Sequence, residues 1–265
     1  LSVDLERNQI KALLKEQLVA VSVDSSGALI DATGVQIPRV LDDLYTSGEQ
    51  DADEAELGVT YSSGQVTASV WAPTAQSVSI QLFNRDKQLL STRPMQLDEA
   101  TGIWSFTAPE AALDRRFYRY EIQVFHPKTE QIETLESTDP YSVSLSSNGR
   151  YTQFVNLEDP DLKPDGWDQH QAPELTALED AVIYETHIRD FSILDQSTSA
   201  QNRGKYLAFT ESDSRPVQHL KKLQQAGLTY VHLLPANDIA SIKEKPEQRV
   251  DITDTVGRLC DLNAD

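Results

Sequence analysis

Hydrophobic and polar residues follow two different periods in the first part of this chain. Between Leu5 and Val19, aliphatic residues recur at helical spacing with charged residues between them, which predicts one amphipathic helix. From Gly58 onward the period is two, which predicts half-buried strands. These strands, separated by turn residues, cover 66–70, 78–82, 103–106, 117–125, 132–135 and 151–157. Short strands with no helical stretch between them predict an all-β, immunoglobulin-like sandwich.

The pattern changes again beyond residue 160, after an irregular connection that contains several prolines. Residues 181–188 form a mostly apolar run of the kind that is buried on both faces of a parallel sheet. A helix is predicted to begin at Pro216 and to stop at Gly227, and residues 228–235 form a second apolar strand. Strand, helix and strand predict one right-handed βαβ unit. Because this unit buries too little apolar surface to be stable alone, further strands are expected after it.

The net charge of the chain excludes some classes of binding partner. Of its 265 residues, 23 are Lys or Arg and 42 are Asp or Glu, which gives a formal net charge of −19. Such a surface repels a phosphate backbone and an anionic membrane, so nucleic acid is not expected as a partner. A neutral glucan is compatible with this charge. The sequence contains no run of about 18 apolar residues that would predict a membrane-spanning segment.

Residues 42–56 carry seven carboxylates and no basic side chain. Such a run is typical of a solvated linker. Calcium binding is the alternative interpretation, although the run lacks the spaced ligands of an EF-hand loop. Cys260 is the only cysteine, so the chain has no internal disulfide and no cysteine cluster for zinc.

Several motifs stand in a characteristic order along the chain. They are VTASVWAPT at 66–74, DPY at 139–141, NGR at 148–150, AVIYETHIRDFS at 181–192, RGKYLA at 203–208 and GLTYVHLLP at 227–235. In this order they resemble the bacterial pullulanases of glycoside hydrolase family 13, of the secreted proteobacterial type, which cleave α-1,6 linkages in pullulan and starch-like glucans. The resemblance extends from Val35 to Asp265. It implies that the sandwich is a carbohydrate-binding module of family 48 and that the later strands open a (β/α)8 barrel.

Four parts of the chain are expected from the periods and the resemblance. Residues 1–57 form a helix-containing segment with an acidic linker, and residues 58–160 form the sandwich. Residues 161–179 connect the sandwich to the barrel, and residues 180–265 form the first, incomplete βαβ portion of that barrel. A complete (β/α)8 barrel needs about 250 residues, so this last part is about a third of one.

The resemblance also implies a retaining hydrolysis with an aspartate nucleophile and a glutamate acid/base. The family motifs that carry these carboxylates, including YNWGYDP, do not occur in this sequence. We therefore predict that the chain alone is inactive and that the activity belongs to a parent pullulanase. The alternative is a non-catalytic α-glucan-binding or interaction module. A truncation product without a function of its own is a third interpretation.

Three residues are candidates for contact with a glucan. Trp104 follows a turn in the sandwich, and its ring could stack on glucose, although aromatic residues of alternating strands usually pack inward. Lys205 and Tyr206 follow the first parallel strand, on the side where barrel enzymes build their sites. A simple surface loop is the alternative for these two residues. Asn237 and Asp238 follow the second strand on the same side and carry the same two interpretations.

A polar group is expected on the first parallel strand, because Glu185, His187 and Arg189 alternate along it. An acid/base pair is one interpretation. A buried, hydrogen-bonded cluster that fixes the strand is the other, since an unpaired buried charge is costly. His232 on the second strand could join this cluster. Two histidines without a third ligand are weak evidence for zinc.

The resemblance has implications for ligands and location as well. It implies no cofactor held by this chain, and calcium as an ion that the full enzyme could hold. The expected partner is an α-glucan such as pullulan, amylopectin or a limit dextrin. The expected location is outside a Gram-negative cell or at its surface, although the chain contains no signal peptide.

Overall fold

The structure, a computed structural model, describes residues 4–48, 51–237, 242–249 and 254–262. The chain divides into two compact units. The first consists of Leu1–Leu162 and Lys243–Asp265, and the second consists of Lys163–Ile242.

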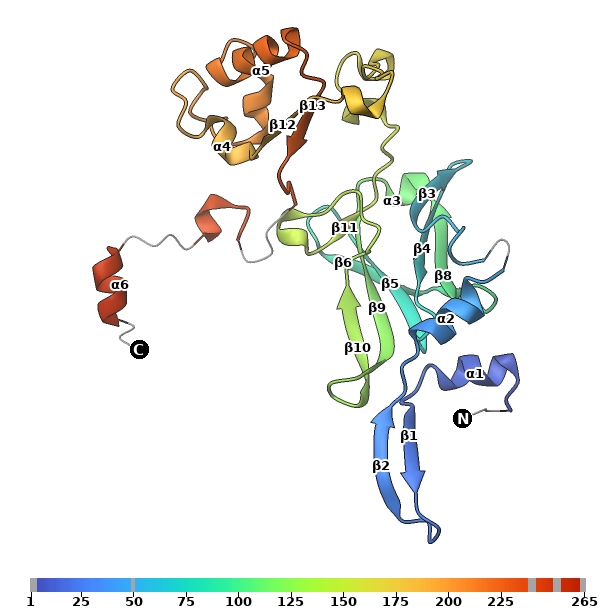
Figure 1. The fold of residues 1–265 in the computed structure, drawn as a ribbon. Helices are drawn as coiled ribbons and strands as arrows, with labels where there is room; N and C mark the ends of the chain where they lie inside the picture. Colours follow the sequence, from blue (N-terminus) through green and yellow to red (C-terminus); the bar gives the residue numbers. More distant parts are fainter. Residues whose placement is uncertain (1–3, 49–50, 238–241, 250–253, 263–265) are drawn as a thin grey trace. The chain divides into compact units, whose positions relative to one another are not determined.

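Two antiparallel sheets make up most of the first unit (Figure 1). One sheet has the strand order β10-β9-β5-β6, with β11 paired to β9, and the other has the order β3-β4-β8-β7. The first sheet consists of β5 Ser77–Phe83, β6 Leu89–Pro94, β9 Phe117–His126, β10 Gln131–Ser137 and β11 Thr152–Gln153. The second consists of β3 Gly58–Ser62, β4 Gln65–Trp71, β7 Gln96–Asp98 and β8 Ile103–Pro109, followed by the short helix α3 Glu110–Leu113.

Side chains from both sheets share one hydrophobic core. Its buried members include Val66, Ala68, Val70, Val78, Ile80, Leu82, Trp104, Tyr118 and Tyr120. Successive side chains of a strand point to opposite faces, which is why the period of two in the sequence identifies these positions. Five of the predicted regions coincide with β4, β5, β8, β9 and β10, and β3, β6 and β7 are additional. The strand predicted at 151–157 is largely wrong, because only Thr152–Gln153 pairs as β11. The sheet-rich fold predicted for this region is confirmed.

One carboxylate is buried against this core. Asp139 is 3% exposed, and its Oδ2 accepts hydrogen bonds from the hydroxyls of Tyr118 (2.6 Å) and Tyr120 (2.9 Å). Its Oδ1 accepts a bond from the backbone N–H of Tyr141 at 2.8 Å, and its own N–H donates to Thr152 Oγ1. Because each carboxylate oxygen has a donor, the charge is tolerated away from water. This Tyr–Asp–Tyr network joins β9 to the segment that follows β10.

Two helices of the N-terminal segment, α1 Arg7–Leu13 and α2 Pro38–Tyr45, pack around a second apolar cluster. Its buried residues are Leu14, Leu44, Tyr45 and Ala52, and Trp71 and Ile103 of the second sheet pack against it. The acidic residues 42–56 are therefore not the solvated linker that the sequence predicts. Leu44, Tyr45 and Ala52 are buried in this cluster, and Asp51 beside it is half-buried. Five other carboxylates of the segment are exposed, those of Asp42, Asp43, Asp53, Glu54 and Glu56.

A buried lysine fastens α1 to the sandwich. Lys11 is 8% exposed, and its Nζ donates to the backbone carbonyls of Glu99 and Ala100. The same ammonium lies 4.2 Å from the centroid of the Tyr45 ring. Burial, and after it the charge of Arg7, lowers the pKa of Lys11. The N-terminal segment and the sandwich are thus joined by polar as well as apolar contacts.

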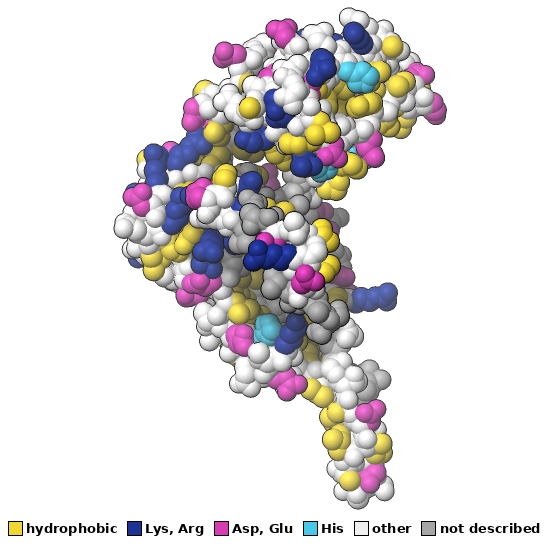
Figure 2. All heavy atoms as spheres, turned by 90° about the vertical axis from the view of Figure 1, so that its left-hand side faces the viewer, with side chains coloured by type: hydrophobic (Ala, Val, Ile, Leu, Met, Phe, Trp, Pro, Cys, Tyr) yellow, Lys and Arg dark blue, Asp and Glu magenta, His cyan; other side chains and the backbone are white. Residues whose placement is uncertain are grey.

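An antiparallel hairpin, β1 Val19–Val23 and β2 Leu29–Gly34, stands between the two helices in sequence. The prediction of a helix that continues to Val19 is wrong, because α1 ends at Leu13. Five aliphatic side chains of the hairpin are 48–66% exposed, and Figure 2 shows hydrophobic side chains along it. They are Val19, Val21, Val23, Leu29 and Ile30. A two-stranded hairpin is marginally stable by itself, so this face is an exception to the usual burial of such residues.

Gly102 makes the turn before β8. Its φ is +71°, in the left-handed region that glycine adopts without cost. A Cβ at this position would lie 2.7 Å from Pro73 Cβ and 3.1 Å from Tyr45 Cε1. Pro73 of the sandwich and Tyr45 of α2 therefore leave no room for a side chain at this turn, and only glycine fits there.

The second unit contains a pair of parallel strands, β12 Ile183–Thr186 and β13 Tyr230–Leu233. Between them in sequence lie α4 Ile188–Ser192 and α5 Arg215–Gln225. The predicted strand, helix and parallel strand are present, with strands shorter than the apolar runs of the sequence. The ring of Tyr184 lies 5.9 Å from that of His219, which shows that α5 packs on β12.

The segment after the second unit returns to the first one. Asn148 donates its backbone N–H to Glu244 Oε1 at 2.8 Å, and Glu244 donates its own N–H to Asn148 Oδ1 at 3.1 Å. The last helix is α6 Val256–Leu262, and Cys260 on it is a free, exposed thiol. Within the described ranges, no helix has the length and apolar character needed to cross a membrane.

Candidate functional site

The structure places Trp104 inside the sandwich. The residue is 7% exposed, and its indole N–H donates to the carbonyl of Ala72 at 3.0 Å. Trp71 is held in a similar way, since its indole N–H donates to the carbonyl of Thr101 at 3.0 Å. Both rings are occupied in packing. The prediction that Trp104 contacts a glucan therefore gains no support from its position.

Lys205 and Tyr206 lie on the surface of the second unit. Lys205 precedes a 3-10 helix, η5 Tyr206–Thr210, and is exposed. Tyr206 is 61% exposed and Leu207 is 59% exposed. We call these three residues the 205–207 ridge. Both interpretations of Lys205 and Tyr206, a groove border and a simple surface loop, allow these exposed positions, and their contact with a glucan stays a prediction.

The ridge is tied to the segment that follows the second parallel strand. The hydroxyl of Tyr206 donates to the carbonyl of Ala236 at 2.8 Å. The loops after β12 and β13 therefore meet at the carboxyl ends of the two strands, which is the side of a parallel sheet where ligands bind. Asn237 is exposed next to this contact, and Asp238 lies outside the described residues.

Asp195 organises the first half of the loop between α4 and α5. Its Oδ2 accepts hydrogen bonds from the hydroxyl of Ser197, and from the backbone N–H (2.8 Å) and hydroxyl (2.9 Å) of Thr198. Its Oδ1 accepts from Arg215 Nε at 2.9 Å. The hydrogen bond from Ser197, followed by those from Thr198, holds the pKa of Asp195 well below its usual range. The carboxylate is therefore charged at neutral pH, and both of its oxygens accept hydrogen bonds from the protein.

Glu211 performs the same task in the second half of the loop. Its carboxylate accepts bonds from the backbone N–H (2.8 Å) and the hydroxyl of Ser199, and from Asn202 Nδ2 at 2.7 Å. The hydroxyl of Ser199 is the largest cause of the lowered pKa of Glu211. Both carboxylates accept bonds from donors in the stretch before the ridge.

Apolar contacts and one glycine complete the loop. The rings of Phe191 and Phe209 stack in parallel with centroids 4.0 Å apart. Gly204 has φ +73°, and its N–H donates to the buried hydroxyl of Ser192 at 2.8 Å. A Cβ on Gly204 would lie 2.9 Å from Ile193 Cδ1. The segment that the sequence leaves open between groove and surface loop is thus a folded element with its own contacts.

The polar group predicted on the first parallel strand is only partly formed. Glu185 and His232 are register partners, and Glu185 Oε2 lies 3.0 Å from His232 Nδ1. Both side chains are more than half exposed, so the expectation of a buried cluster is wrong in this chain. His187 does not join them. β12 ends at Thr186, and His187 caps α4, where its Nδ1 accepts the N–H of Arg189.

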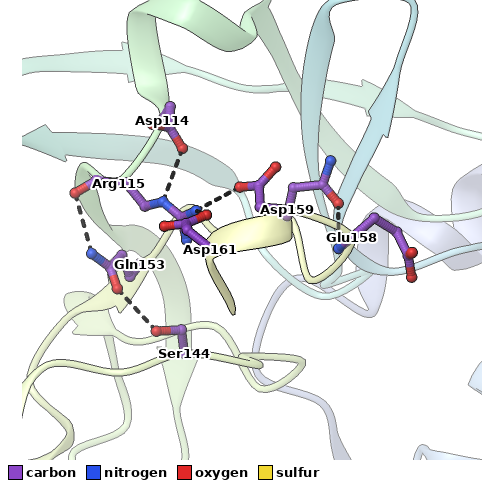
Figure 3. Close-up of polar contacts among 8 residues, drawn as sticks. Asp114, Arg115, Ser144, Gln153, Glu158, Asp159 and Asp161 are labelled. Carbon is purple, nitrogen blue, oxygen red and sulfur yellow. Dashed lines mark hydrogen bonds and ion pairs between the residues drawn. The ribbon is translucent and has the colours of Figure 1, made fainter. Parts of the chain in front are cut away.

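A charged cluster that no sequence pattern indicates lies where the chain leaves the sandwich (Figure 3). Arg115 contacts Asp159 at 2.6 Å, Asp161 at 2.9 Å and Asp114 at 3.4 Å. Arg115 has φ +57°, an unusual conformation for a residue with a side chain. It borders a hollow of about 1040 Å³ that Phe117 and Gln153 also line. No motif signals this cluster, because Asp159 and Asp161 lie 44 and 46 residues from Arg115 in sequence.

A metal site is not apparent in the described ranges. No three His, Cys, Asp or Glu side chains of the described residues come together in a way that could hold an ion. The expectation that the full enzyme could hold calcium is a statement about the whole protein and stays a prediction.

Two family models match parts of the chain. The Pullulanase N2 domain matches residues 1–43, and carbohydrate-binding module 48 (isoamylase N-terminal domain) matches residues 56–142. The first match covers α1, α2 up to residue 43 and the exposed hairpin, and the second covers most of the two sheets.

Relatives of known name match almost the whole chain. The pullulanase of Klebsiella pneumoniae is 42% identical over 259 residues, which are 96% of this chain and 23% of that protein. Chloroplastic pullulanase 1 of Arabidopsis thaliana is 42% identical over 243 residues, which are 90% of this chain and 24% of the relative. The chain therefore spans about a quarter of the length of these relatives.

Solved structures agree with this result. The crystal structure of PulA from Klebsiella oxytoca superposes with a TM-score of 0.87 and 42% identity over 99% of this chain and 25% of its own. A maltotriose complex of PulA from Klebsiella pneumoniae superposes with a TM-score of 0.86 and 41% identity over 96% of this chain and 27% of its own.

Proposed function

We propose, because this chain belongs to the pullulanase family, that the protein containing it hydrolyses α-1,6-glucosidic linkages in pullulan and starch-like glucans. The relatives are pullulanases, and this chain corresponds to about a quarter of each. The activity therefore belongs to the whole protein. A retaining glycosidase places two carboxylates about 5–5.5 Å apart across the bond it cleaves. We propose that residues outside this chain supply them.

We further propose that β12, α5 and β13 begin the (β/α)8 barrel of that enzyme. The parallel pairing of the strands and the packing of α5 on β12 support this assignment. A barrel builds its active site from the loops at the carboxyl ends of its strands. The loop that carries Tyr206 is then the first of those loops.

The 205–207 ridge is proposed to contact the glucan. The observation that carries this proposal is the hydrogen bond from Tyr206 to Ala236, because it brings two strand-end loops together beneath an exposed ring. An aromatic ring with one apolar face and a polar tip is suited to a sugar, which has both kinds of surface. Lys205 supplies donors for the sugar hydroxyls next to it.

The decisive experiment compares the whole parent pullulanase with the 265-residue chain. We expect the parent to release reducing ends from pullulan, and we expect the chain to release none above a control lacking protein. The physical reason is that the two catalytic carboxylates are absent from the chain. Hydrolysis by the purified chain would overturn the division of roles, and an inactive parent would overturn the proposed function.

A second candidate function, α-glucan binding without catalysis, is favoured by the module 48 match at residues 56–142. A relative has been solved with maltotriose, which is a fact about that protein. We expect the chain to migrate more slowly in a native gel that contains amylopectin than in a plain gel. Bovine serum albumin is the reference, and equal relative migration in both gels would contradict glucan binding by this chain.

Two expectations about the whole protein complete the proposal. We propose that the parent acts outside a Gram-negative cell or at its surface, which fractionation of cells expressing it would test. We also propose that the parent can hold calcium, for which elemental analysis of the purified parent is the test. The resemblance of the sequence to secreted proteobacterial pullulanases supports both.

A further inference from the structure

We infer that Asp195 and Glu211 are positioning residues that hold the 205–207 ridge ready for the glucan. This inference rests on the proposed function, because it assigns a role to residues around the same site. Neither carboxylate is placed on the ridge itself. Hydrogen bonds connect each of them to the ridge.

The connection from Asp195 passes through the backbone of the loop. Asp195 accepts from both the N–H and the hydroxyl of Thr198. The carbonyl of Thr198 in turn accepts from the guanidinium of Arg203 at 3.0 Å. Arg203 directly precedes Gly204, whose φ of +73° turns the chain into the ridge. A change at Asp195 therefore reaches Lys205 through only two hydrogen-bonded steps.

The connection from Glu211 is equally short. Glu211 accepts from Ser199 and from the side chain of Asn202. The carbonyl of Asn202 accepts the N–H of Lys205 at 3.0 Å, and the carbonyl of Lys205 accepts the N–H of Ala208 at 3.0 Å. Hydrogen bonds thus connect the turn that carries the ridge to Asp195 and to Glu211.

The loop buries residues on both sides of the exposed ridge, which indicates that the ridge is held in one conformation. Thr198 is 1% exposed and Ala208 is fully buried, whereas Tyr206 between them is 61% exposed. A binding group that is already ordered loses less conformational freedom when its ligand arrives. The expected function of the two carboxylates is therefore to improve glucan affinity through Tyr206, with no part in the bond-breaking step.

The test uses the whole parent pullulanase with pullulan as substrate. We expect Tyr206→Ala to raise KM about threefold to tenfold, the range for loss of one aromatic contact, with kcat within twofold of the parent. Asp195→Ala and Glu211→Ala are expected to raise KM to a similar degree with the same unchanged kcat. Asp213→Ala is the matched control, since Asp213 is an exposed acid of the same loop with no hydrogen bond among the described contacts.

A double-mutant cycle separates positioning from a general structural effect. If Asp195 acts through Tyr206, the pair Asp195→Ala with Tyr206→Ala raises KM no more than Tyr206→Ala alone. Multiplying effects in the double variant would overturn the inference. A fall in kcat at unchanged KM, or no change in either constant, would overturn it as well.

Two further arms keep the outcome decisive. If Asp195→Ala does not fold, Ser197→Ala and Thr198→Val replace it, because each removes one hydrogen bond that Asp195 accepts. Each of these variants is expected to raise KM about twofold when Tyr206 is present and to leave KM unchanged in the Tyr206→Ala background. If the parent proves inactive on pullulan, the proposed function fails. The same double-mutant cycle is then measured as the retardation of each variant in a native gel that contains pullulan. Independent effects of Asp195→Ala and Tyr206→Ala on this retardation would overturn the inference, whatever the fate of the proposed function.

Discussion

Replacing Asp139 with alanine is expected to lower the melting temperature of the sandwich by at least about 10 °C, because the loss of stability is about 3–5 kcal/mol. The change removes the acceptor of two hydroxyls, those of Tyr118 and Tyr120, which are both fully buried. Hydrogen bonds to a charged acceptor contribute about 1.5–3 kcal/mol each, and buried donors without a partner carry a desolvation penalty. Circular dichroism during heating measures the effect.

Two comparison variants sharpen this prediction. Asp86→Ala removes an exposed acid from the turn between β5 and β6 and is expected to change the stability by less than about 0.5 kcal/mol. Tyr118→Phe in the Asp139→Ala background removes one orphaned hydroxyl and is expected to recover part of the loss. A melting temperature for Asp139→Ala equal to that of Asp86→Ala would show that the network contributes little.

Replacing Gly102 with alanine is expected to lower the free energy of unfolding by about 3 kcal/mol. Holding a residue with a Cβ in the left-handed conformation costs about 1–2 kcal/mol, and overpacking a closed site adds about 1–3 kcal/mol. Both terms apply, since the new methyl would lie 2.7 Å from Pro73 and 3.1 Å from Tyr45. Urea denaturation followed by tryptophan fluorescence measures the change.

Gly64 offers a matched control for this substitution. Its φ is +74°, close to that of Gly102, but a Cβ there meets nothing within 4 Å. Gly64→Ala is therefore expected to cost only the conformational term, about 1–2 kcal/mol. Equal losses for the two variants would mean that the contacts with Pro73 and Tyr45 relax freely.

The sandwich could be predicted well because its strands have one buried and one exposed face. Val66, Ala68 and Val70 alternate with polar residues, and all three are buried. The hairpin at 19–34 was missed for the opposite reason. Val19, Val21 and Val23 also alternate, but they are exposed, and their pattern merges with that of the preceding helix. Alternation of apolar and polar residues predicts a strand, but it does not show whether another element buries the apolar face of that strand.

Of the candidate site, the sequence indicates the loop that carries its residues but not how that loop is held. The motif at 203–208 led to Lys205 and Tyr206, and both are at the surface of the second unit. The roles of Asp195 and Glu211 could not be predicted, because they depend on how a loop folds back on itself. Apart from Arg215, their partners are short polar residues of a kind that any surface loop contains. Trp104 shows the converse, since its type suggested a binding residue while its position is in the core.

The Tyr–Asp–Tyr network also gives the sandwich an internal optical signal. Burial is the largest cause that raises the pKa of Tyr118 and of Tyr120 far above the ordinary 10, and the charge of Asp139 adds to it. Because the folded-state pKa lies above the unfolded value, the protonated phenols stabilise the fold below about pH 10, and this stabilisation is lost as the pH rises further. In an alkaline titration these two phenols are expected to resist ionisation for as long as the sandwich stays folded. These two rings then ionise together, in the same step in which the sandwich unfolds.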